Sequence, residues 1–326
     1  MKKIVALIIF IIFTVTFAGC SAPQNKISYS YRFGYETDHE DKLLESFIYN
    51  VKAQQLSADN TLNPPFYIKG EGTYTVNIYK QKSDFKIVTD FSFTGRYHFT
   101  ADDSESEEFT DTIHSESLAT IGFDYFTPIS AQKSFDSSLP SFEGEKKSKK
   151  AYYSYNIGYQ QINNDIKITS AVKDDEMDDK DKVLIADETN ADVTLTTGSR
   201  LIDNEHIFLA VRLQNIDSKF TDSFNVFDSL YGIMQKMSIT TKENFEEKEF
   251  DGKKYECYAL AASISGKNKG SDTLMYIAQS YYYDYLNKGI LEDNININLL
   301  IEFKHGNLIY TLSEYNNYAK GQKHQD

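Results

Sequence analysis

Positive charge is scarce in this chain. Its 326 residues carry 34 lysines and arginines against 48 aspartates and glutamates, a formal net charge of -14, and only four of the basic residues are arginines. Each phosphate contact of a nucleic-acid-binding protein needs a lysine or arginine, so the acidic balance excludes nucleic acid as a partner. Tryptophan is absent. Carbohydrate-binding modules tend to use its large ring face, so this absence weighs against such a module.

Repeats and familiar catalytic signatures are also absent. No segment recurs with a period of about 20 to 50 residues, which argues against a solenoid or a propeller. The sequence contains no Gly-x-Ser-x-Gly, no Walker phosphate-binding loop and no Gly-x-Gly-x-x-Gly. Its histidines lack the spacing typical of zinc sites; they stand at positions 39, 98, 114, 206, 305 and 324. We therefore expect no metal, no cofactor and no catalytic residues.

Two short motifs resemble part of the signature of penicillin-binding proteins and serine β-lactamases. Residues 130–133 (SAQK) match Ser-x-x-Lys, and residues 154–156 (SYN) match Ser-x-Asn. The third mark, Lys-Thr-Gly or Lys-Ser-Gly, is missing, and Ser154 lies within a pattern typical of a strand. The sequence therefore favours a binding protein over an enzyme.

The composition is that of a globular protein rich in aromatic residues. Hydrophobic residues make up 40% of the chain and charged residues 25%, which excludes disorder and a collagen-like fold. A chain of about 300 residues buries about three quarters of its unfolded surface, enough for one large domain or two modest ones. The 24 tyrosines and 22 phenylalanines suit either the packing of a sheet or the stacking of a ligand.

The first 20 residues have the pattern of a secretion signal. Lys2 and Lys3 precede the apolar run 4–17, which is too short to span a bilayer, since a spanning helix needs about 20 residues. The run ends in the sequence Phe-Ala-Gly-Cys at 17–20. This junction resembles the lipobox of bacterial lipoprotein precursors, with phenylalanine in the place where leucine is usual.

The resemblance implies a lipid anchor. Residues 1–19 would be removed as a signal peptide, and Cys20 would receive diacylglycerol and an acyl chain such as palmitate. Residues 20–30 would then form the lipidated cysteine and a tether, on the extracytoplasmic face of the cell membrane. An ordinary signal peptide cut nearby, or an uncleaved anchor, is the alternative. The second cysteine, Cys257, would have no partner in the chain, so we expect a buried, inert thiol.

Hydrophobic and polar residues alternate over much of the chain, as is typical of half-buried β-strands. Asp251-Gly252 and Gly306-Asn307 favour tight turns and predict two hairpins. We expect strands at 74–78, 85–93, 96–100, 109–114, 153–159, 166–172, 192–197, 207–213, 255–264, 295–303 and 308–312.

Helices are expected in three places. Residues 37–57 begin with the capping box Thr37-x-x-Glu40 and place apolar residues on one helical face, although the same segment also alternates as a strand would. Residues 271–288 carry an apolar stripe at helical spacing that ends before Gly289. A shorter helical turn is expected over 228–237.

Three polar stretches predict exposed loops: 102–108, 143–150 and 173–182. The carboxylates of the last stretch could attract Ca²⁺, but they lack the glycine and the distant glutamate of an EF-hand loop, so a solvated loop is the better interpretation. This stretch either divides residues 31–326 into two subdomains or forms the tip of a long hairpin.

Together these patterns predict an α+β fold dominated by β-structure, with antiparallel strands in one curved sheet or two packed sheets and a few helices covering a face. Such a sheet could enclose an apolar groove, as in lipoprotein carriers with a LolA-like half-barrel, a comparison that rests on architecture alone. The expected function is binding of a lipid or another hydrophobic ligand, with Tyr281, Tyr282 and Tyr285 as candidate contacts. The alternative is a surface interaction or adhesion protein that binds another protein or cell-wall glycan.

Overall fold

The computed structural model describes thirteen parts of the chain, and every statement below concerns them: residues 42–54, 66–81, 84–121, 126–138, 151–162, 165–173, 190–194, 201–212, 214, 216–228, 233–265, 273–282 and 296–318. Within these parts the protein is dominated by β-structure, with sixteen strands in one sheet. One short α-helix and one 3-10 helix accompany the sheet, fewer helices than the sequence led us to expect.

The strands follow one another around the sheet almost in chain order. From one edge to the other the order is β10-β11-β12-β13-β14-β15-β16-β1-β2-β3-β5-β6-β7-β8-β9, with β4 paired to β3. The strands are β1 (Lys42–Ala53), β2 (Phe66–Gln81), β3 (Asp84–Phe99), β4 (Ser104–Glu105), β5 (Phe109–Ile121), β6 (Phe126–Ser137), β7 (Ala151–Ile162), β8 (Asp165–Lys173), β9 (Asn190–Thr194), β10 (Leu201–Asp203), β11 (Thr221–Asp228), β12 (Ile233–Phe250), β13 (Lys253–Ser265), β14 (Thr273–Tyr282), β15 (Asn296–His305) and β16 (Leu308–Asn317).

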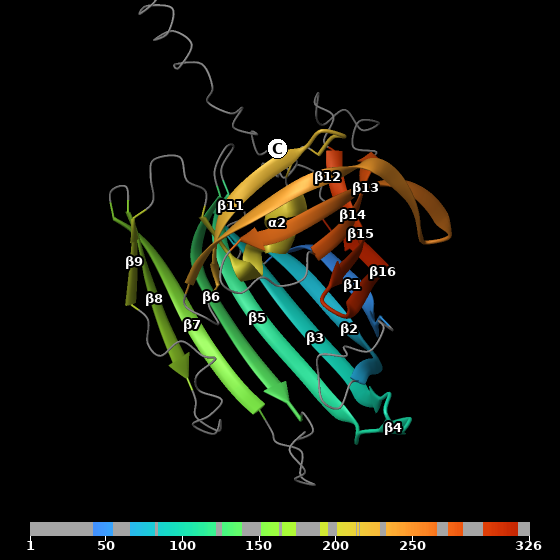
Figure 1. Cartoon of the computed structure of the whole chain (residues 1–326). Helices are drawn as coiled ribbons and strands as arrows, with labels where there is room; N and C mark the ends of the chain where they lie inside the picture. Colours follow the sequence, from blue (N-terminus) through green and yellow to red (C-terminus); the bar gives the residue numbers. More distant parts are fainter. Residues whose placement is uncertain are drawn as a thin grey trace, which may run out of the picture.

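The sheet curves around its own helix. Strand β16 pairs with β1, so the first and second halves of the chain join into one surface. Strands β10 and β11 pair in parallel, and their crossover contains η2 (Asn204–His206) and α2 (Ile207–Arg212). The crossover brings β10 against β6 and η2 against β5. As a result α2 lies on the concave side of the sheet, between strands β1 to β6 and strands β11 to β13 (Figure 1).

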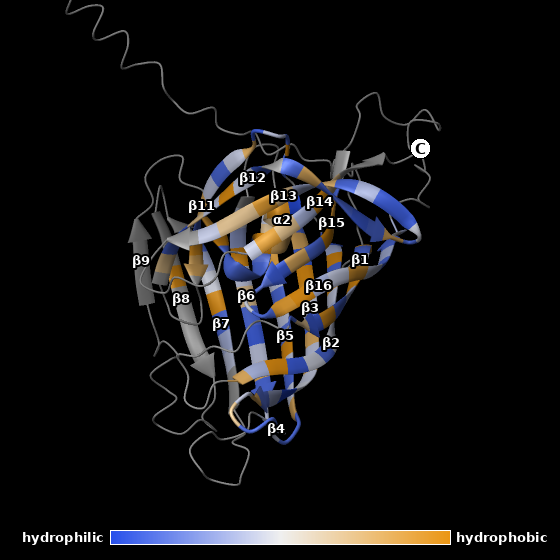
Figure 2. Cartoon of the chain, turned by 45° about the vertical axis from the view of Figure 1, so that its right-hand side comes forward, coloured by the Kyte–Doolittle hydropathy of each residue, from blue (hydrophilic) through white to orange (hydrophobic). Residues whose placement is uncertain are grey.

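Alternation explains why the long strands form. In β3 the side chains of Phe85, Ile87 and Phe93 are buried, while Asp90 and Ser92 between them are exposed. Because successive side chains of a strand point to opposite faces, the three buried residues lie on the concave face and the two exposed residues on the convex face. Figure 2 shows the same change between hydrophobic and hydrophilic residues along neighbouring strands. The strands predicted at 85–93 and 96–100 are one continuous strand, β3, which is longer than either pattern indicated and ends at Phe99.

Both predicted hairpins are present. Asp251 and Gly252 have φ values of 51° and 67° and join β12 to β13. Two successive residues with positive φ form the turn that matches the twist of the flanking strands. Gly306, with φ of 55°, joins β15 to β16, where His305 stands opposite Leu308. The Asp-Gly and Gly-Asn pairs therefore set the register of these two hairpins.

A buried ion pair holds α2 to the sheet. Arg212 donates from Nη1 and Nη2 to the two carboxylate oxygens of Glu45 on β1, at 3.0 and 3.1 Å, and neither side chain has appreciable solvent exposure. Arg212 Nε also donates to the Asn298 carbonyl at 2.9 Å, and Tyr315 donates to Glu45 at 2.6 Å. The guanidinium lies 4.3 Å from the centre of the Phe47 ring. These contacts connect α2 with β1, β15 and β16.

The helix expected over 37–57 is wrong where the structure describes it, because residues 42–53 form strand β1. Phe47, Tyr49 and Val51 are buried, whereas Asn50 and Lys52 are exposed, so the alternation in this segment decided its structure. Residues 37–41 lie outside the described parts.

The helix expected over 271–288 is also wrong for its first part, since residues 273–282 form β14, while 283–288 are outside the described parts. Four successive residues, Met275 to Ala278, are buried, so the strand reads as a continuous apolar run and its period is hidden. The helical turn expected over 228–237 is wrong as well, because strand β12 begins at Ile233. Conversely, the strand expected over 207–213 is helix α2 at 207–212, because its buried apolar residues fit either period.

The polar stretch 102–108 is exposed around β4, as predicted. Stretches 143–150 and 174–182 lie outside the described residues, so a division of the chain near 173–182 stays a prediction. Among the described helices, none is long and apolar enough to cross a membrane.

Candidate ligand-binding site

The concave face of the sheet contains an aromatic pocket. Strands β2, β3 and β5 form its floor, and the turn between β15 and β16 covers it. The cavity measures about 350 Å³, within the size range of small-molecule sites. It is lined by Ile68, Phe91, Phe93, Tyr97, Phe109, Asp111, His305, Gly306, Asn307 and Leu308.

The aromatic rings of the floor form a continuous row. Phe91 and Phe93 stack at 6.3 Å between ring centroids, Phe93 lies 6.2 Å from Phe109, and Phe109 stacks on Tyr97 at 5.0 Å. All four residues occupy odd-numbered positions in β3 and β5, which the pleat places on one face. The row therefore follows directly from alternation in two adjacent strands.

A carboxylate and an imidazole are among the residues that line this pocket, Asp111 from β5 and His305 from the end of β15. Asp111 follows Phe109 on the same face of β5, and the Ser137 hydroxyl donates to its Oδ1. Burial raises the pKa of Asp111, and the hydrogen bond from Ser137 offsets part of that shift. His305 is exposed as a whole residue, but desolvation of its ring, followed by the positive charge of Lys133, lowers its pKa; its Nδ1 lies 2.9 Å from Thr273 Oγ1. His305 is therefore neutral at neutral pH.

A second polar cluster lies farther along the concave face, where β10 and η2 meet β6 and β7. Lys133 Nζ contacts Glu205 Oε1 at 2.6 Å, and the Tyr155 hydroxyl donates to the same oxygen at 3.3 Å. Tyr159 donates to Asp203 Oδ2, and the Glu205 backbone N–H donates to Asp203 Oδ1 at 2.8 Å. The buried charges of the cluster thus connect β10 and η2 to strands β6 and β7.

The two carboxylates of the polar cluster have opposite pKa shifts. Burial, reinforced by the charge of Glu205, raises the pKa of Asp203 to about 7. Burial alone would also raise the pKa of Glu205, but the charge of Lys133 together with hydrogen bonds from Lys133, Ser115 and Tyr155 outweighs it, and the pKa is lowered. Burial lowers the pKa of the adjacent His206 to about 3. At neutral pH the cluster therefore contains an ionised Glu205–Lys133 pair beside a neutral histidine.

The structure separates the serine and the lysine of the Ser-x-x-Lys motif. Ser130 and Lys133 are three residues apart in β6, so they lie on opposite faces of the sheet. Lys133 reaches Glu205 on the concave side, whereas Ser130 lines a second groove of about 260 Å³ together with Asn156. The two motif elements therefore do not form one constellation around Ser130.

The aromatic contacts expected from sequence stay a prediction, because the structure describes only the backbone of Tyr281 and Tyr282. The backbone places Tyr281 and Tyr282 in β14 rather than in a helix, opposite Ile297 and Asn296. Tyr285 and Cys20 lie outside the described residues. The aromatic pocket itself was missed, although the alternation of Phe91, Phe93 and Phe109 was the signal that could have found it.

Cys257 is buried and free, as expected. Burial raises the pKa of its thiol to about 12, so it stays protonated at neutral pH. Within the described residues, no group of three or more histidine, cysteine, aspartate or glutamate side chains could hold a metal ion.

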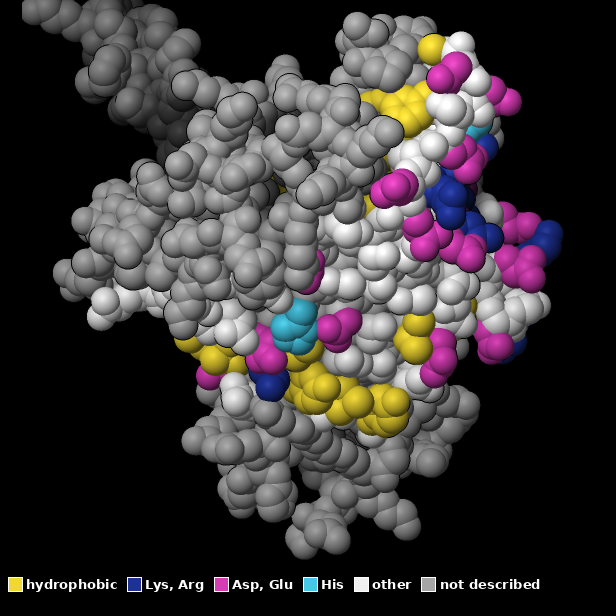
Figure 3. Space-filling view, turned by 90° about the horizontal axis from the view of Figure 1, so that it is seen from below, with side chains coloured by type: hydrophobic (Ala, Val, Ile, Leu, Met, Phe, Trp, Pro, Cys, Tyr) yellow, Lys and Arg dark blue, Asp and Glu magenta, His cyan; other side chains and the backbone are white. Residues whose placement is uncertain are grey.

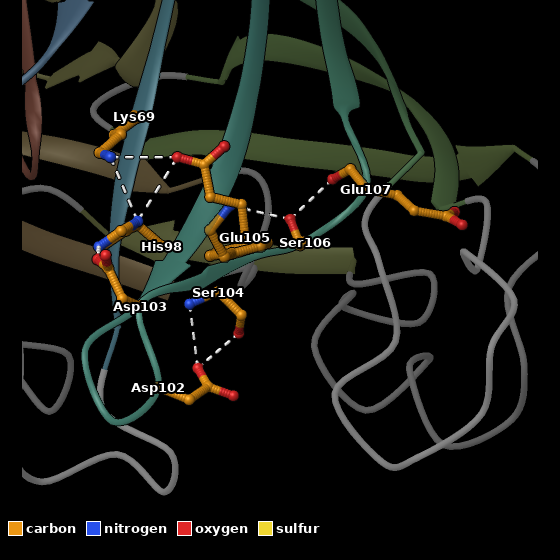
Figure 4. A network of polar contacts seen from close by, with 9 residues as sticks. Lys69, His98, Asp102, Asp103, Ser104, Glu105, Ser106 and Glu107 are labelled. Atoms are coloured by element: carbon orange, nitrogen blue, oxygen red, sulfur yellow. Dashed lines mark hydrogen bonds and ion pairs between the residues drawn. The ribbon is translucent and has the colours of Figure 1, made fainter.

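A third polar network lies on the surface where β3 turns into β4 (Figure 4). Lys69 Nζ lies 3.2 Å from His98 Nδ1 and 3.1 Å from Glu105 Oε1, while His98 Nε2 contacts Asp103 at 2.9 Å. Asp103 has φ of 58° and closes the turn, and Asp102 accepts from Ser104. Lys69, Glu105 and Asp103 are exposed around the buried His98, and their contacts join β2, β3 and the turn, so we assign them to fixing the turn.

Comparisons with known proteins leave the chain without a family. No family model and no curated protein matches its sequence. Among solved structures, the chain is similar to a beta-barrel-like protein of a domain of unknown function (DUF1849) from Brucella abortus. The TM-score is 0.44 at 10% sequence identity, and the match covers 86% of this chain and 100% of that chain. A similarity of this degree assigns neither a family nor an activity.

Proposed function

We propose that this protein binds an apolar small molecule in the aromatic pocket on the concave face of its sheet. The observation that carries the proposal is the pocket's composition. Four aromatic rings and two aliphatic side chains line about 350 Å³, and few polar groups accompany them. Ligand sites typically combine a mainly apolar lining with a small number of polar groups that fix orientation.

We also propose that the chain is a lipoprotein anchored through Cys20 on the extracytoplasmic face of the cell membrane. The support is the signal-like segment 1–20 with its Phe-Ala-Gly-Cys junction. Diacylglycerol supplies the two chains that stable anchoring requires. An anchored binding protein would meet lipids and other apolar molecules at the membrane surface. Metabolic labelling with palmitate tests the anchor: the wild-type chain incorporates label, and the Cys20→Ser variant does not.

Filling the pocket tests the binding proposal. Leu308 lines the pocket at the β15–β16 turn, and the next residue, Ile309, stands opposite the exposed Lys52 on the convex face. Leu308→Trp should weaken the binding of the fluorescent apolar probe N-phenyl-1-naphthylamine at least tenfold, because the indole occupies the cavity. Ile309→Trp adds the same side chain outside the pocket and should leave binding unchanged. Equal binding by both variants would refute the assignment.

A groove on the other side of the sheet favours the alternative function, a surface interaction protein. Glu116, Gln132 and Asn156 stand opposite one another in β5, β6 and β7, and they line about 260 Å³ with Lys86 and Ser130. Such a row of hydrogen-bonding groups suits a hydroxyl-rich polymer. Sedimentation with purified cell-wall glycan tests this: Gln132→Ala should reduce binding if the groove is used, and the Leu308→Trp variant should bind normally.

A further inference from the structure

The aromatic pocket has an unbalanced charge. Among the described residues that line it, Asp111 is the acidic side chain and none is a lysine or an arginine. His305, which also lines the pocket, does not add a compensating positive charge, because desolvation of its ring and then the positive charge of Lys133 lower its pKa. Lys133 itself contacts Glu205 at 2.6 Å. The lining therefore favours a ligand group of positive charge.

The rings around this carboxylate suit an organic cation. Phe91 is the partly exposed ring of the lining, whereas Phe93, Tyr97 and Phe109 are 2%, 7% and 2% exposed and pack on one another. A cation attracts an aromatic face when it lies within about 6 Å of the ring centre, and aromatic walls are the usual recognition device for quaternary ammonium groups. Metal cations need several oxygen ligands, whereas the lining offers mainly carbon surface.

We propose that the ligand of this pocket is an amphiphile with an organic ammonium head, whose cation lies against the Asp111 carboxylate beside the partly exposed Phe91 ring. The proposal rests on the function proposed above and names its substrate class. The apolar part of the ligand contacts Phe91, Ile68 and Leu308, which line the same cavity.

The charge of the whole molecule acts in the same direction. The formal net charge is -14, and the surface seen from below shows more acidic than basic side chains (Figure 3). A negative field raises the local concentration of cations and repels anionic amphiphiles. The protein therefore selects against fatty-acid anions before they reach the pocket.

The test compares three probes of equal chain length on the full chain carrying Cys20→Ser: octyltrimethylammonium, octanol and octanoate, measured by isothermal titration calorimetry. We expect octyltrimethylammonium to bind about tenfold tighter than octanol, and octanoate to bind weakest. Asp111→Asn should remove the preference for the cation while octanol binding persists. Asp90→Asn makes the same charge change on the convex face of β3, where Asp90 is exposed, and should keep the preference.

The outcomes separate the two proposals. Binding of octanol without a preference for the cation overturns the ammonium head and leaves the apolar pocket standing. A preference that survives Asp111→Asn equally overturns the assignment of the cation to this carboxylate. Failure of all three probes to bind overturns the proposed function, and the ammonium head with it.

Discussion

At the scale of single residues, the contact between Arg212 and Glu45 has the largest consequence for folding. Both side chains are inaccessible to solvent and share two hydrogen bonds. A buried ion pair stabilises a fold little more than an apolar pair of similar volume would. Removing one partner, however, leaves an uncompensated charge in the core. The pair therefore makes the position of α2 depend on β1.

The Glu45→Gln variant tests this dependence. It leaves the Arg212 guanidinium without a countercharge, so we expect a loss of about 3 to 5 kcal/mol in the free energy of unfolding, measured with urea. The exposed Glu247, which contacts Lys254 at 2.6 Å, offers a matched control. Glu247→Gln should leave the urea midpoint unchanged. Similar midpoints for both variants would contradict the structural role of the buried pair.

Asp203 should make stability depend on pH. Its pKa is about 7 in the folded protein, against an ordinary value of 3.8, so between these values the folded state retains a proton that the unfolded state releases. The stabilisation that Asp203 gives the folded state is fully present below about pH 4 and is lost as the pH rises through 7. Relative to Asp203→Asn, the wild type should therefore lose stability over this interval, by at most about 1.4 kcal/mol per pH unit.

The comparison with the asparagine variant isolates this group. Glu205, Lys133 and His206 remain in both proteins, so their own titrations largely cancel in the difference. Tyr159, which donates to Asp203, also remains. Denaturation curves at several pH values from 4 to 8 give the result, and parallel pH profiles for the two proteins would contradict the raised pKa.

Individual residues also show where prediction from sequence stops. Asp251-Gly252 and Gly306-Asn307 were sufficient to predict two hairpins, because a residue with positive φ is a local requirement. Nothing local indicates that Glu45 meets Arg212, since the two are 167 positions apart. The same holds for Asp111 and His305, which face one pocket from β5 and β15.

At the scale of elements, several strands with one buried face were predicted, although β1 was expected as a helix, and runs with successive buried residues were predicted poorly. Strand β3 alternates, and its position was predicted from sequence. In β14 and α2 successive residues are buried, so neither the strand period nor the helix period stands out. The segment of β14 was therefore predicted as a helix and that of α2 as a strand. Tertiary packing, rather than local preference, decides the structure of such apolar runs.

The close approach of β2 and β3 gives a prediction at this scale. A Cβ at Gly72 would overlap the carbonyl oxygen of Ser92 on β3, whereas a Cβ at Gly158 on β7 would meet nothing within 4 Å. Gly72→Ala should force these strands apart and lower the melting temperature by several degrees. Gly158→Ala should leave the melting temperature unchanged or raise it slightly. Differential scanning calorimetry measures both; equal temperatures would contradict the close approach.

At the scale of the whole molecule, the pocket is a product of topology. Strands β2, β3 and β5 come from the first half of the chain, and the β15–β16 turn that covers them comes from its end. The pairing of β16 with β1 brings the two together. The sequence was sufficient to predict a curved β-rich sheet and to suggest a hydrophobic ligand. The residues of the site could not, because they depend on this long-range pairing.

Native mass spectrometry of the protein purified gently from its own envelope tests the central claim most directly. We predict that the wild-type chain and Ile309→Trp retain an additional small-molecule mass that organic extraction removes, and that Leu308→Trp lacks it. If the same mass accompanies Leu308→Trp, or if no additional mass accompanies the wild type, the assignment of the aromatic pocket as a ligand site is wrong.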